Sequence, residues 1–232
     1  MKSLKQLYQN VIELNQKIVS EGLVKLTWGN ASGIDRINNR VIIKPSGIDV
    51  HELKVFDLSK VSIKTGKLIK GKTPSVDTPT HLEIYKNFND VNFIIHTHSQ
   101  YCTAFAQSKR PIFCFGTTHA DYFNGKIPVV YDLQKNEIEN NYEKNIGLSI
   151  VNYFIDKNIS YTEVPGCLIP GHGVYVWGKT KQQALENAIV IEEVAKLAYL
   201  SENIIGTKLL SDNLLKKHFY RKHGSQKYYG QR

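Results

Sequence analysis

The chain has 232 residues, of which 41% are hydrophobic and 22% charged, and this composition is typical of a globular protein rather than of a disordered or fibrous one. No apolar run reaches the ~20 residues of a membrane helix and the N-terminus lacks the apolar segment of a signal peptide, which favours a cytoplasmic protein with no membrane partner. The formal net charge of +9 suits anionic partners, either nucleic acid or phosphorylated metabolites, and it also suits an ordinary solvated surface.

The first third of the sequence predicts one helix and two hairpins. Residues 31–37 and 41–44 flank an Asn-Asn turn, and residues 60–64 and 67–70 flank a Thr-Gly turn, so each pair predicts two antiparallel strands. Before them, apolar residues recur at helical spacing up to Gly22 and predict an amphipathic helix. Its apolar face consists of Leu4, Leu7, Val11, Leu14 and Ile18.

The middle of the chain predicts a helix, a buried strand and two further helices. Thr78 is the predicted N-cap and Pro79 the first helical residue of a helix that runs to about residue 88. Residues 91–98 form an apolar run that ends in histidines and predict a buried strand. A helix is expected to begin near residue 99, and another to cover residues 145–157.

The last third predicts a hairpin and a long helix. Residues 167–170 and 174–177 are strand-like and flank a Gly-His-Gly turn, and residues 181–205 carry apolar positions at helical spacing. Residues 216–232 are basic and aromatic with little apolar periodicity. We therefore expect one α/β domain over residues 1–232, with a central, mostly antiparallel sheet covered by helices.

Four side chains could form a metal site. His96 and His98 are two residues apart on a predicted strand, so both imidazoles point to the same face. His172 lies between two glycines, which leave its ring unobstructed, and Asp77 precedes a helix, where a carboxylate is also favoured without a metal. Each pattern alone fits a structural role as well. Their joint occurrence favours a site for Zn²⁺ or a similar first-row ion.

Eight short runs match one known family in the same order along essentially the whole chain. They are Leu-Thr-Trp-Gly-Asn at 26–30, Ile-Lys-Pro-Ser-Gly at 43–47, Asp-Thr-Pro-Thr-His at 77–81, His-Thr-His-Ser at 96–99, Gly-Thr-Thr-His-Ala-Asp-Tyr-Phe at 116–123, Gly-His-Gly at 171–173, Arg-Lys-His-Gly at 221–224 and Tyr-Tyr-Gly-Gln at 228–231. With them the chain resembles the class II aldolase family. The runs at 117–123 and 228–231 point to its branch of L-ribulose-5-phosphate 4-epimerases.

The resemblance implies a metal site and a phosphate pocket. One divalent ion per subunit, with Zn²⁺ expected first and Mn²⁺ as the alternative, would be held by Asp77, His96, His98 and His172. The phosphate of a phosphorylated sugar substrate would be held by Gly29, Asn30, Ser46, Gly47, Ser75 and Val76, with Lys44 nearby. The position of Val76 is commonly Ser in the family, although a backbone N–H can serve there.

The resemblance also implies acid–base residues and a shared active site. Asp121 and Tyr229 match the acid–base positions, and His218 and Glu143 match residues expected in the same site. Tyr229 lies in the stretch with little apolar pattern of its own. We therefore expect it to dock on a neighbouring subunit of a cyclic homotetramer rather than on its own core.

The implied reaction interconverts L-ribulose 5-phosphate and D-xylulose 5-phosphate. The C4 hydrogen of a 2-ketose is not adjacent to the carbonyl carbon, and the sequence has no GxGxxG motif for a nicotinamide-dependent route. Retro-aldol cleavage of the C3–C4 bond, rotation of the aldehyde and re-addition would invert C4 instead. A metal on the ketose oxygens would stabilise the enediolate, and two acid–base groups would serve the two faces of the aldehyde.

Three other functions fit parts of the pattern. A class II aldolase acting on fuculose or rhamnulose 1-phosphate would share the metal and phosphate sites, but the aldolases tend to have Glu where this chain has the shorter Asp77. A non-enzymatic interaction module like the adducin head domain lacks the metal histidines that are present here. A nucleic-acid partner is suggested only by the charge, and the sequence contains no recognition motif for one.

Overall fold

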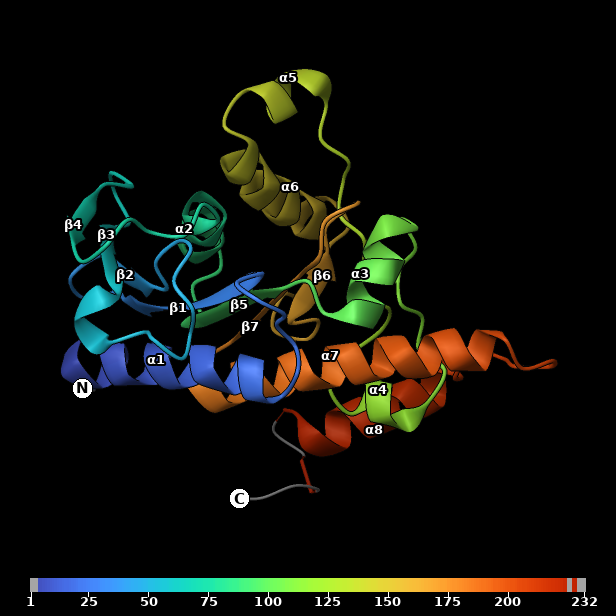
Figure 1. Ribbon diagram of the computed structural model, residues 1–232. Coiled ribbons are helices and arrows are strands. Elements are labelled where there is room, and N and C mark those ends of the chain that lie inside the picture. Colours follow the sequence, from blue (N-terminus) through green and yellow to red (C-terminus); the bar gives the residue numbers. More distant parts are fainter. Residues whose placement is uncertain (1–3, 225–226, 229–232) are drawn as a thin grey trace.

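A seven-stranded sheet forms the centre of the computed structural model, which describes residues 4–224 and 227–228 (Figure 1). Every pair of neighbouring strands is antiparallel, which confirms the predicted α/β architecture. From one edge to the other the strands are β4 (Leu68–Lys70), β3 (Ser59–Ser62), β2 (Arg40–Ile43), β1 (Gly29–Asp35), β5 (Phe93–Thr97), β7 (Val174–Gly178) and β6 (Gly166–Leu168).

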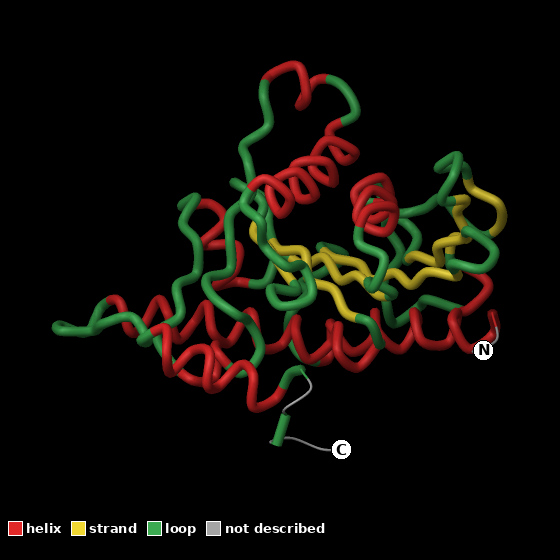
Figure 2. Tube along the Cα trace, turned by 180° about the vertical axis from the view of Figure 1, so that it is seen from behind, coloured by secondary structure: helices red, strands yellow, loops and turns green. Residues whose placement is uncertain are grey.

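Helices cover both faces of the sheet (Figures 1 and 2). One face is covered by α1 (Leu4–Ser20) and α7 (Lys181–Glu202), and the other by α2 (Thr78–Asn87) and α6 (Tyr142–Asp156). Because both faces are covered, the central strands β5 and β7 are buried along their whole length and read as apolar runs rather than as alternating patterns. The remaining helices are η1 (Val55–Asp57), α3 (Gln100–Gln107), α4 (Thr117–Ala120), α5 (Lys135–Glu139) and α8 (Asp212–Lys222).

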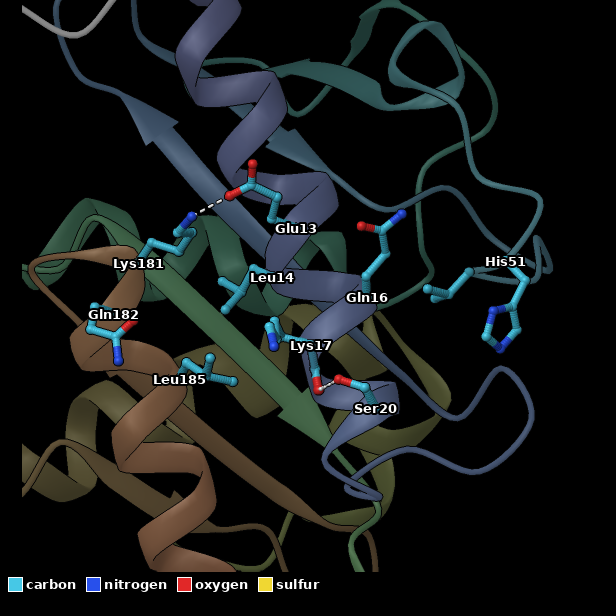
Figure 3. Close-up of a pocket in the computed structure, with 10 residues that line it drawn as sticks. Glu13, Leu14, Gln16, Lys17, Ser20, His51, Lys181, Gln182 and Leu185 are labelled. Atoms are coloured by element: carbon cyan, nitrogen blue, oxygen red, sulfur yellow. Dashed lines mark hydrogen bonds and ion pairs between the residues drawn. The ribbon is translucent and has the colours of Figure 1, made fainter.

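α1 packs on its face of the sheet through apolar side chains and one buried amide. Four of the five predicted apolar residues of α1 are buried and Leu4 is partly buried. Asn15 lies on the same face. Its side chain accepts a hydrogen bond from the backbone N–H of Ala31 at 2.9 Å and donates to the carbonyl of Ala31 at 3.1 Å, so these two polar groups of β1 are satisfied although they are buried. Between α1 and the start of α7 lies a cavity of about 500 Å³, edged by an ion pair of Glu13 and Lys181 (Figure 3). It contains none of the predicted site residues.

The predicted elements are all present, with shifts of a few residues at their ends. The N-cap of α2 is Asp77, and the predicted cap, Thr78, is the first helical residue. The predicted helix at 145–157 starts three residues earlier, at Tyr142, and the long helix ends at Glu202 instead of residue 205.

The first part of residues 216–232, which show little apolar periodicity, belongs to a helix that the sequence did not predict. There α8 begins after Ser211, whose hydroxyl accepts a hydrogen bond from the N–H of Leu214. This helix buries only Leu215 and Phe219, four residues apart, and Leu215 packs with Cys114 and Ala120. An apolar stripe this narrow gives a weak sequence signal, yet it folds this part of the chain back onto its own subunit. Tyr229 lies outside the described residues.

None of the helices within residues 4–224 and 227–228 is both long and apolar enough to span a membrane.

Candidate metal centre

Three histidines converge where β5 ends and the turn between β6 and β7 leads into β7. His96 is the penultimate residue of β5, His98 follows the strand, and His172 lies in the turn that leads into the neighbouring strand β7. One ring nitrogen from each histidine lies within 4.8 Å of the corresponding nitrogens of the other two, and the Nε2 atoms of His96 and His98 are 3.1 Å apart. We call this group the histidine triad.

The triad is held in the neutral form that binds metals. Burial lowers the pKa of His96 to about 3, against an opposing effect of Asp77, and burial also lowers the pKa values of His98 and His172. At neutral pH each imidazole therefore has a lone pair on one nitrogen. Neutral imidazole nitrogens are the form in which histidine ligates Zn²⁺ and other first-row ions.

The hydrogen bonds of the triad fit a bound cation. The Nδ1–H of His96 donates to the carbonyl of Val174 at 3.0 Å, so its Nε2 carries the lone pair and faces the Nε2 of His98. The buried Nδ1 of His172 has no hydrogen-bond partner among the described residues. The Nε2 of His96 accepts a hydrogen bond from the Nε2 of His98 when His98 carries its proton there, whereas the buried, unpartnered nitrogen of His172 is costly without a ligand. A divalent ion with a preference for nitrogen would satisfy this arrangement.

Gly173 makes the close approach of the turn possible. A Cβ atom at this position would lie 2.6 Å from the carbonyl oxygen of Thr97 and 3.4 Å from ring atoms of both His96 and His98. The neighbouring Gly171 has a φ of +66° and no atom within 4 Å of such a Cβ, so its requirement is conformational rather than steric.

Asp77 lies beside the triad but is not one of the group whose ligand atoms are all within 4.8 Å. Its Oδ2 accepts hydrogen bonds from Asn30 at 2.7 Å and from the Ser75 hydroxyl at 3.3 Å. Burial raises the pKa of Asp77, but His96, other nearby histidines and the Asn30 hydrogen bond outweigh burial, so this pKa lies below its usual value. The carboxylate is thus a fixed negative charge next to the triad, and its role as fourth ligand stays a prediction.

The predicted phosphate loops meet next to Asp77. Ser75 donates its backbone N–H to the carbonyl of Lys44, and Ser46 donates to Thr73, so the two loops run side by side. Asn30, in β1 next to Gly29, donates to the Ser75 hydroxyl at 3.1 Å. The other two predicted loop residues, Gly47 and Val76, lie in these same loops, and the Val76 side chain is exposed.

Lys44 is an unusual member of these loops because it is buried. Its ammonium group donates only to the carbonyl of Pro45, at 3.3 Å, among the hydrogen bonds of the described residues. Burial lowers the pKa of Lys44, against an opposing effect of Asp49. A buried ammonium group with one hydrogen bond is costly unless an anion accompanies it.

Two of the predicted active-site residues form a separate cluster. Asp121, directly after α4, accepts hydrogen bonds from His218 Nδ1 at 3.0 Å and from two nitrogens of Arg221 at 3.1 and 2.9 Å. Both partners lie on α8. In Figures 1 and 2, α4 and α8 lie on the side of α7 that faces away from the sheet, whereas the triad lies on the sheet face that α2 covers. Within one chain the cluster is therefore separated from the triad.

The third predicted active-site residue of the described chain lies near the triad. Glu143 is the second residue of α6, and its backbone carbonyl accepts a hydrogen bond from the Thr80 hydroxyl. Its neighbour Tyr142, which the sequence analysis did not single out, has its ring 6.4 Å from that of His172. Burial, then Glu143 and Asp77, raise the pKa of Tyr142. No periodicity or motif in the sequence marks Tyr142 as part of the site.

The fold and the triad together define a class of protein. The chain belongs to the family of the class II aldolase and adducin N-terminal domain, whose family model matches residues 9–199.

Solved structures with this fold include sugar-phosphate aldolases. An L-fuculose 1-phosphate aldolase is 24% identical, with a TM-score of 0.79 over 95% of this chain and 97% of that chain. YgbL from Klebsiella pneumoniae, described as a putative aldolase/epimerase/decarboxylase, is 24% identical, with a TM-score of 0.75 over 94% and 99%. The l-fuculose-1-phosphate aldolase of Thermus thermophilus is 19% identical, with a TM-score of 0.66 over 89% and 100%. At these identities the similarity concerns the fold.

Gly173→Ala should weaken metal binding more than it weakens the fold. The added methyl group would push the turn away from Thr97 and from two rings of the triad. We expect the Zn²⁺ dissociation constant to rise at least about 10-fold and the free energy of unfolding to fall by about 1–3 kcal/mol, measured by chelator competition and urea unfolding. Gly171→Asn, which tolerates positive φ, is the control and should bind Zn²⁺ normally. Wild-type affinity in Gly173→Ala would show that the close approach is not needed.

Asp121→Asn should remove stability that depends on pH. Burial raises the pKa of Asp121, but Arg221, His218 and Lys222 outweigh burial and hold it below its usual value. A depressed folded-state pKa stabilises the fold above the unfolded-state pKa of about 3.9, and this stability is lost as pH falls through the folded-state value. Urea unfolding should therefore show a loss of about 1–3 kcal/mol at pH 7 that shrinks between about pH 4 and pH 2.

The matched control for this variant is Asp132→Asn, which removes an exposed ion pair with Lys109. Its effect should stay below about 0.5 kcal/mol at every pH. An equal, pH-independent loss of unfolding free energy in both variants would contradict the conclusion that Arg221 and His218 hold the Asp121 carboxylate ionised.

Proposed function

We propose that the protein is an L-ribulose-5-phosphate 4-epimerase, which interconverts L-ribulose 5-phosphate and D-xylulose 5-phosphate. The observation that carries this proposal is the double hydrogen bond of Asn30. Its side-chain amide donates both to Ser75 of the phosphate loops and to Asp77 beside the triad. One residue thus links the proposed phosphate loops to the candidate metal centre, an arrangement that suits a ketose phosphate with its phosphate a few carbons from the carbonyl.

The chain's own residues bind and orient this substrate. Backbone N–H groups and hydroxyls of the loops at 29–30, 44–47 and 73–76 would hold the phosphate oxygens, and the buried Lys44 would gain the anion that its position calls for. A divalent ion held by the triad would supply Lewis-acid stabilisation of negative charge on the ketose oxygens. Fixing both ends of a short sugar phosphate leaves the C3–C4 bond in a defined place between them.

Inversion at C4 then proceeds by cleavage and re-formation of the C3–C4 bond, with proton transfers at the C4 oxygen. A base removes the proton of the C4 hydroxyl, the C3–C4 bond breaks, and its electron pair passes to the enediolate of the three-carbon fragment. The C4 carbon becomes the aldehyde carbon of glycolaldehyde phosphate. The aldehyde rotates and accepts the electron pair on its other face. An acid returns a proton to the C4 oxygen, so atoms and electrons balance without an oxidant.

Asp121 and Tyr229 are the proposed proton-transfer groups, and the position of Asp121 supports an active site shared between subunits. Because the Asp121 cluster lies beyond α7 in its own chain, Asp121 can serve only the triad of another copy. His218 and Arg221 would orient its carboxylate there. A cyclic homotetramer, as the sequence resemblance implies, gives each triad one such neighbour.

A class II aldolase acting on fuculose or rhamnulose 1-phosphate is the second candidate, because it would use the same triad and phosphate loops. Asp77 favours the epimerase. Its carboxylate is one methylene shorter than the Glu expected in the aldolases, and Asn30 and Ser75 hold one of its oxygens. Such a carboxylate is better suited to a fixed charge or ligand than to a mobile base. The triad argues against a non-enzymatic, adducin-like module.

The proposal is tested by two assays on the same metal-loaded protein. The first couples formation of D-xylulose 5-phosphate from L-ribulose 5-phosphate, and the second measures aldol addition of dihydroxyacetone phosphate to L-lactaldehyde. We expect turnover in the first and at least about 100-fold lower kcat/KM in the second. L-Ribulose without the phosphate should also be far poorer, because phosphate binding positions the reacting carbons. Dominant aldolase activity would replace the proposal by the second candidate.

Chains with complementary defects should restore activity when they are assembled together. His98→Ala removes a triad nitrogen and Asp121→Asn removes the proposed proton-transfer group, so each variant alone should be nearly inactive. Mixed from unfolded chains, they should regain about a quarter of wild-type activity if subunits pair at random, since one pairing in four joins an intact triad to an intact Asp121. A mixture of His98→Ala with His172→Ala is the control and should regain none. Mixed oligomers without activity would contradict the shared site.

A further inference from the structure

A row of paired residues crosses the sheet at the metal centre. Asn30 of β1 pairs with His96 of β5, and His96 pairs with Tyr175 of β7. Directly paired residues of neighbouring strands have their side chains on the same face. The face that carries His96 and the Asn30 amide therefore also carries the ring of Tyr175.

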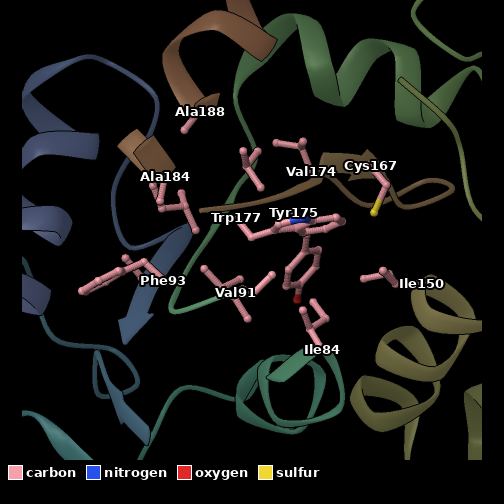
Figure 4. Close-up of a cluster of buried hydrophobic side chains, with 14 of the residues drawn as sticks. Ile84, Val91, Phe93, Ile150, Cys167, Val174, Tyr175, Trp177, Ala184 and Ala188 are labelled. Carbon is pink, nitrogen blue, oxygen red and sulfur yellow. The ribbon is translucent and has the colours of Figure 1, made fainter. Parts of the chain in front are cut away.

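Tyr175 stacks on the ring of His96. The ring centroids are 4.3 Å apart and the planes differ by 17°, and the Tyr175 side chain is completely buried. In Figure 4 the Tyr175 ring lies between its strand and Ile84 of α2. The Tyr175 ring therefore packs flat against one of the three candidate ligand rings. This contact lies in the tightly packed core rather than at the surface.

The Tyr175 ring is itself held by α2. The edge of the His81 ring packs against it at a centroid distance of 5.7 Å and an angle of 70°. His81 Nδ1 is 2.7 Å from the Ser32 hydroxyl, which is 2.8 Å from the Tyr85 hydroxyl. The N-cap Asp77 and the α2 residues His81 and Tyr85 follow one another at intervals of four residues, so they lie on one side of the helix. These contacts fix α2, and with it Asp77, on the sheet face that carries the row.

His96 is the most constrained member of the triad. Its Nδ1–H donates to the Val174 carbonyl, which limits rotation of the ring in its own plane, and Tyr175 limits tilting of that plane. His172 differs, because its buried Nδ1 lacks a partner among the described residues. One ligand of the centre is therefore positioned before any ion binds, which lowers the ordering cost of binding.

We propose that Tyr175 is a positioning residue of the metal centre, whose aromatic face holds the imidazole plane of His96 with Nε2 directed at the ion. The inference rests on the proposed function, since it presupposes an ion at the triad. The ring rather than the hydroxyl carries the role. The buried hydroxyl lies near the Thr80 side chain but makes no hydrogen bond of normal geometry to a described residue.

The test compares metal binding by Tyr175→Phe and Tyr175→Leu with that of the wild type. Zn²⁺ affinity is measured by chelator competition, and the Co²⁺-loaded proteins are compared by visible absorption. The Phe variant keeps the stack and should stay within about 2-fold of the wild-type dissociation constant. The Leu variant should bind at least about 10-fold more weakly, the size of effect seen when an outer partner of a ligand is lost, and its Co²⁺ absorption should change.

The control for lost packing is Phe93→Leu. This residue is also a buried aromatic on β5, but an odd number of positions from His96 and so on the opposite face. It should lose stability and keep the wild-type Zn²⁺ dissociation constant. If the Leu variant does not fold, Tyr175→Met replaces it, because Met fills space without offering a flat face.

A measurement on the wild type is independent of every variant. In histidine-labelled protein, the ring protons of His96 should show an upfield ring-current shift without metal that persists when Zn²⁺ is added. Loss of that shift on binding, or wild-type affinity in a folded Leu or Met variant, overturns the positioning role. Failure of the wild type itself to bind an ion would instead overturn the proposed function.

Discussion

The pairing of β5 with β7 is the constraint on which the rest of the structure depends. This antiparallel pair places Thr97 opposite Val174, so the turn that leads into β7 reaches the end of β5 where His98 lies. Both strands are buried by helices on either face, and their apolar residues fix the register by packing. A shift of one residue would turn every side chain of one strand to the other face, and the triad would be lost.

The same pairing imposes requirements on its neighbours. Gly173 is needed because the turn approaches the carbonyl of Thr97 too closely for a side chain. Tyr175 is brought onto the ring of His96 by the register, and Asn30 is brought to its other side by β1. The polar contacts of α2 with this face then set the distance between Asp77 and the triad. A small set of backbone hydrogen bonds thus determines which side chains surround the candidate ion.

Much of this site follows from local sequence patterns, and the rest depends on contacts between distant segments. The two-residue spacing of His96 and His98 and the glycines around His172 are local signals, and they predicted the three residues that the structure brings together. The stack of Tyr175 on His96 requires the register of strands almost eighty residues apart, which periodicity does not specify. Asp121 is bound by Arg221, which lies far away in the sequence, and α8 buries only two apolar residues. Neither feature leaves a periodic pattern in the sequence.

If Asp121 acts in catalysis as proposed, its separation from the triad within one chain would make the enzyme depend on assembly. The sheet supplies the candidate metal and phosphate sites, and the layer beyond α7 supplies a carboxylate whose orientation is fixed by His218 and Arg221. Each part is held by its own contacts in the folded chain, so we expect the two to stay apart inside one subunit. Association between copies would then be part of the catalytic mechanism rather than only a source of stability.

The central claim is that the triad binds one divalent ion, and anomalous diffraction from Zn²⁺-loaded crystals at the zinc absorption edge tests it most directly. The account predicts one strong anomalous peak per subunit, with a nitrogen of His96, of His98 and of His172 each at about 2.0–2.1 Å. A peak bound by other residues, or the absence of a peak at the triad in crystals that contain the metal, would contradict it.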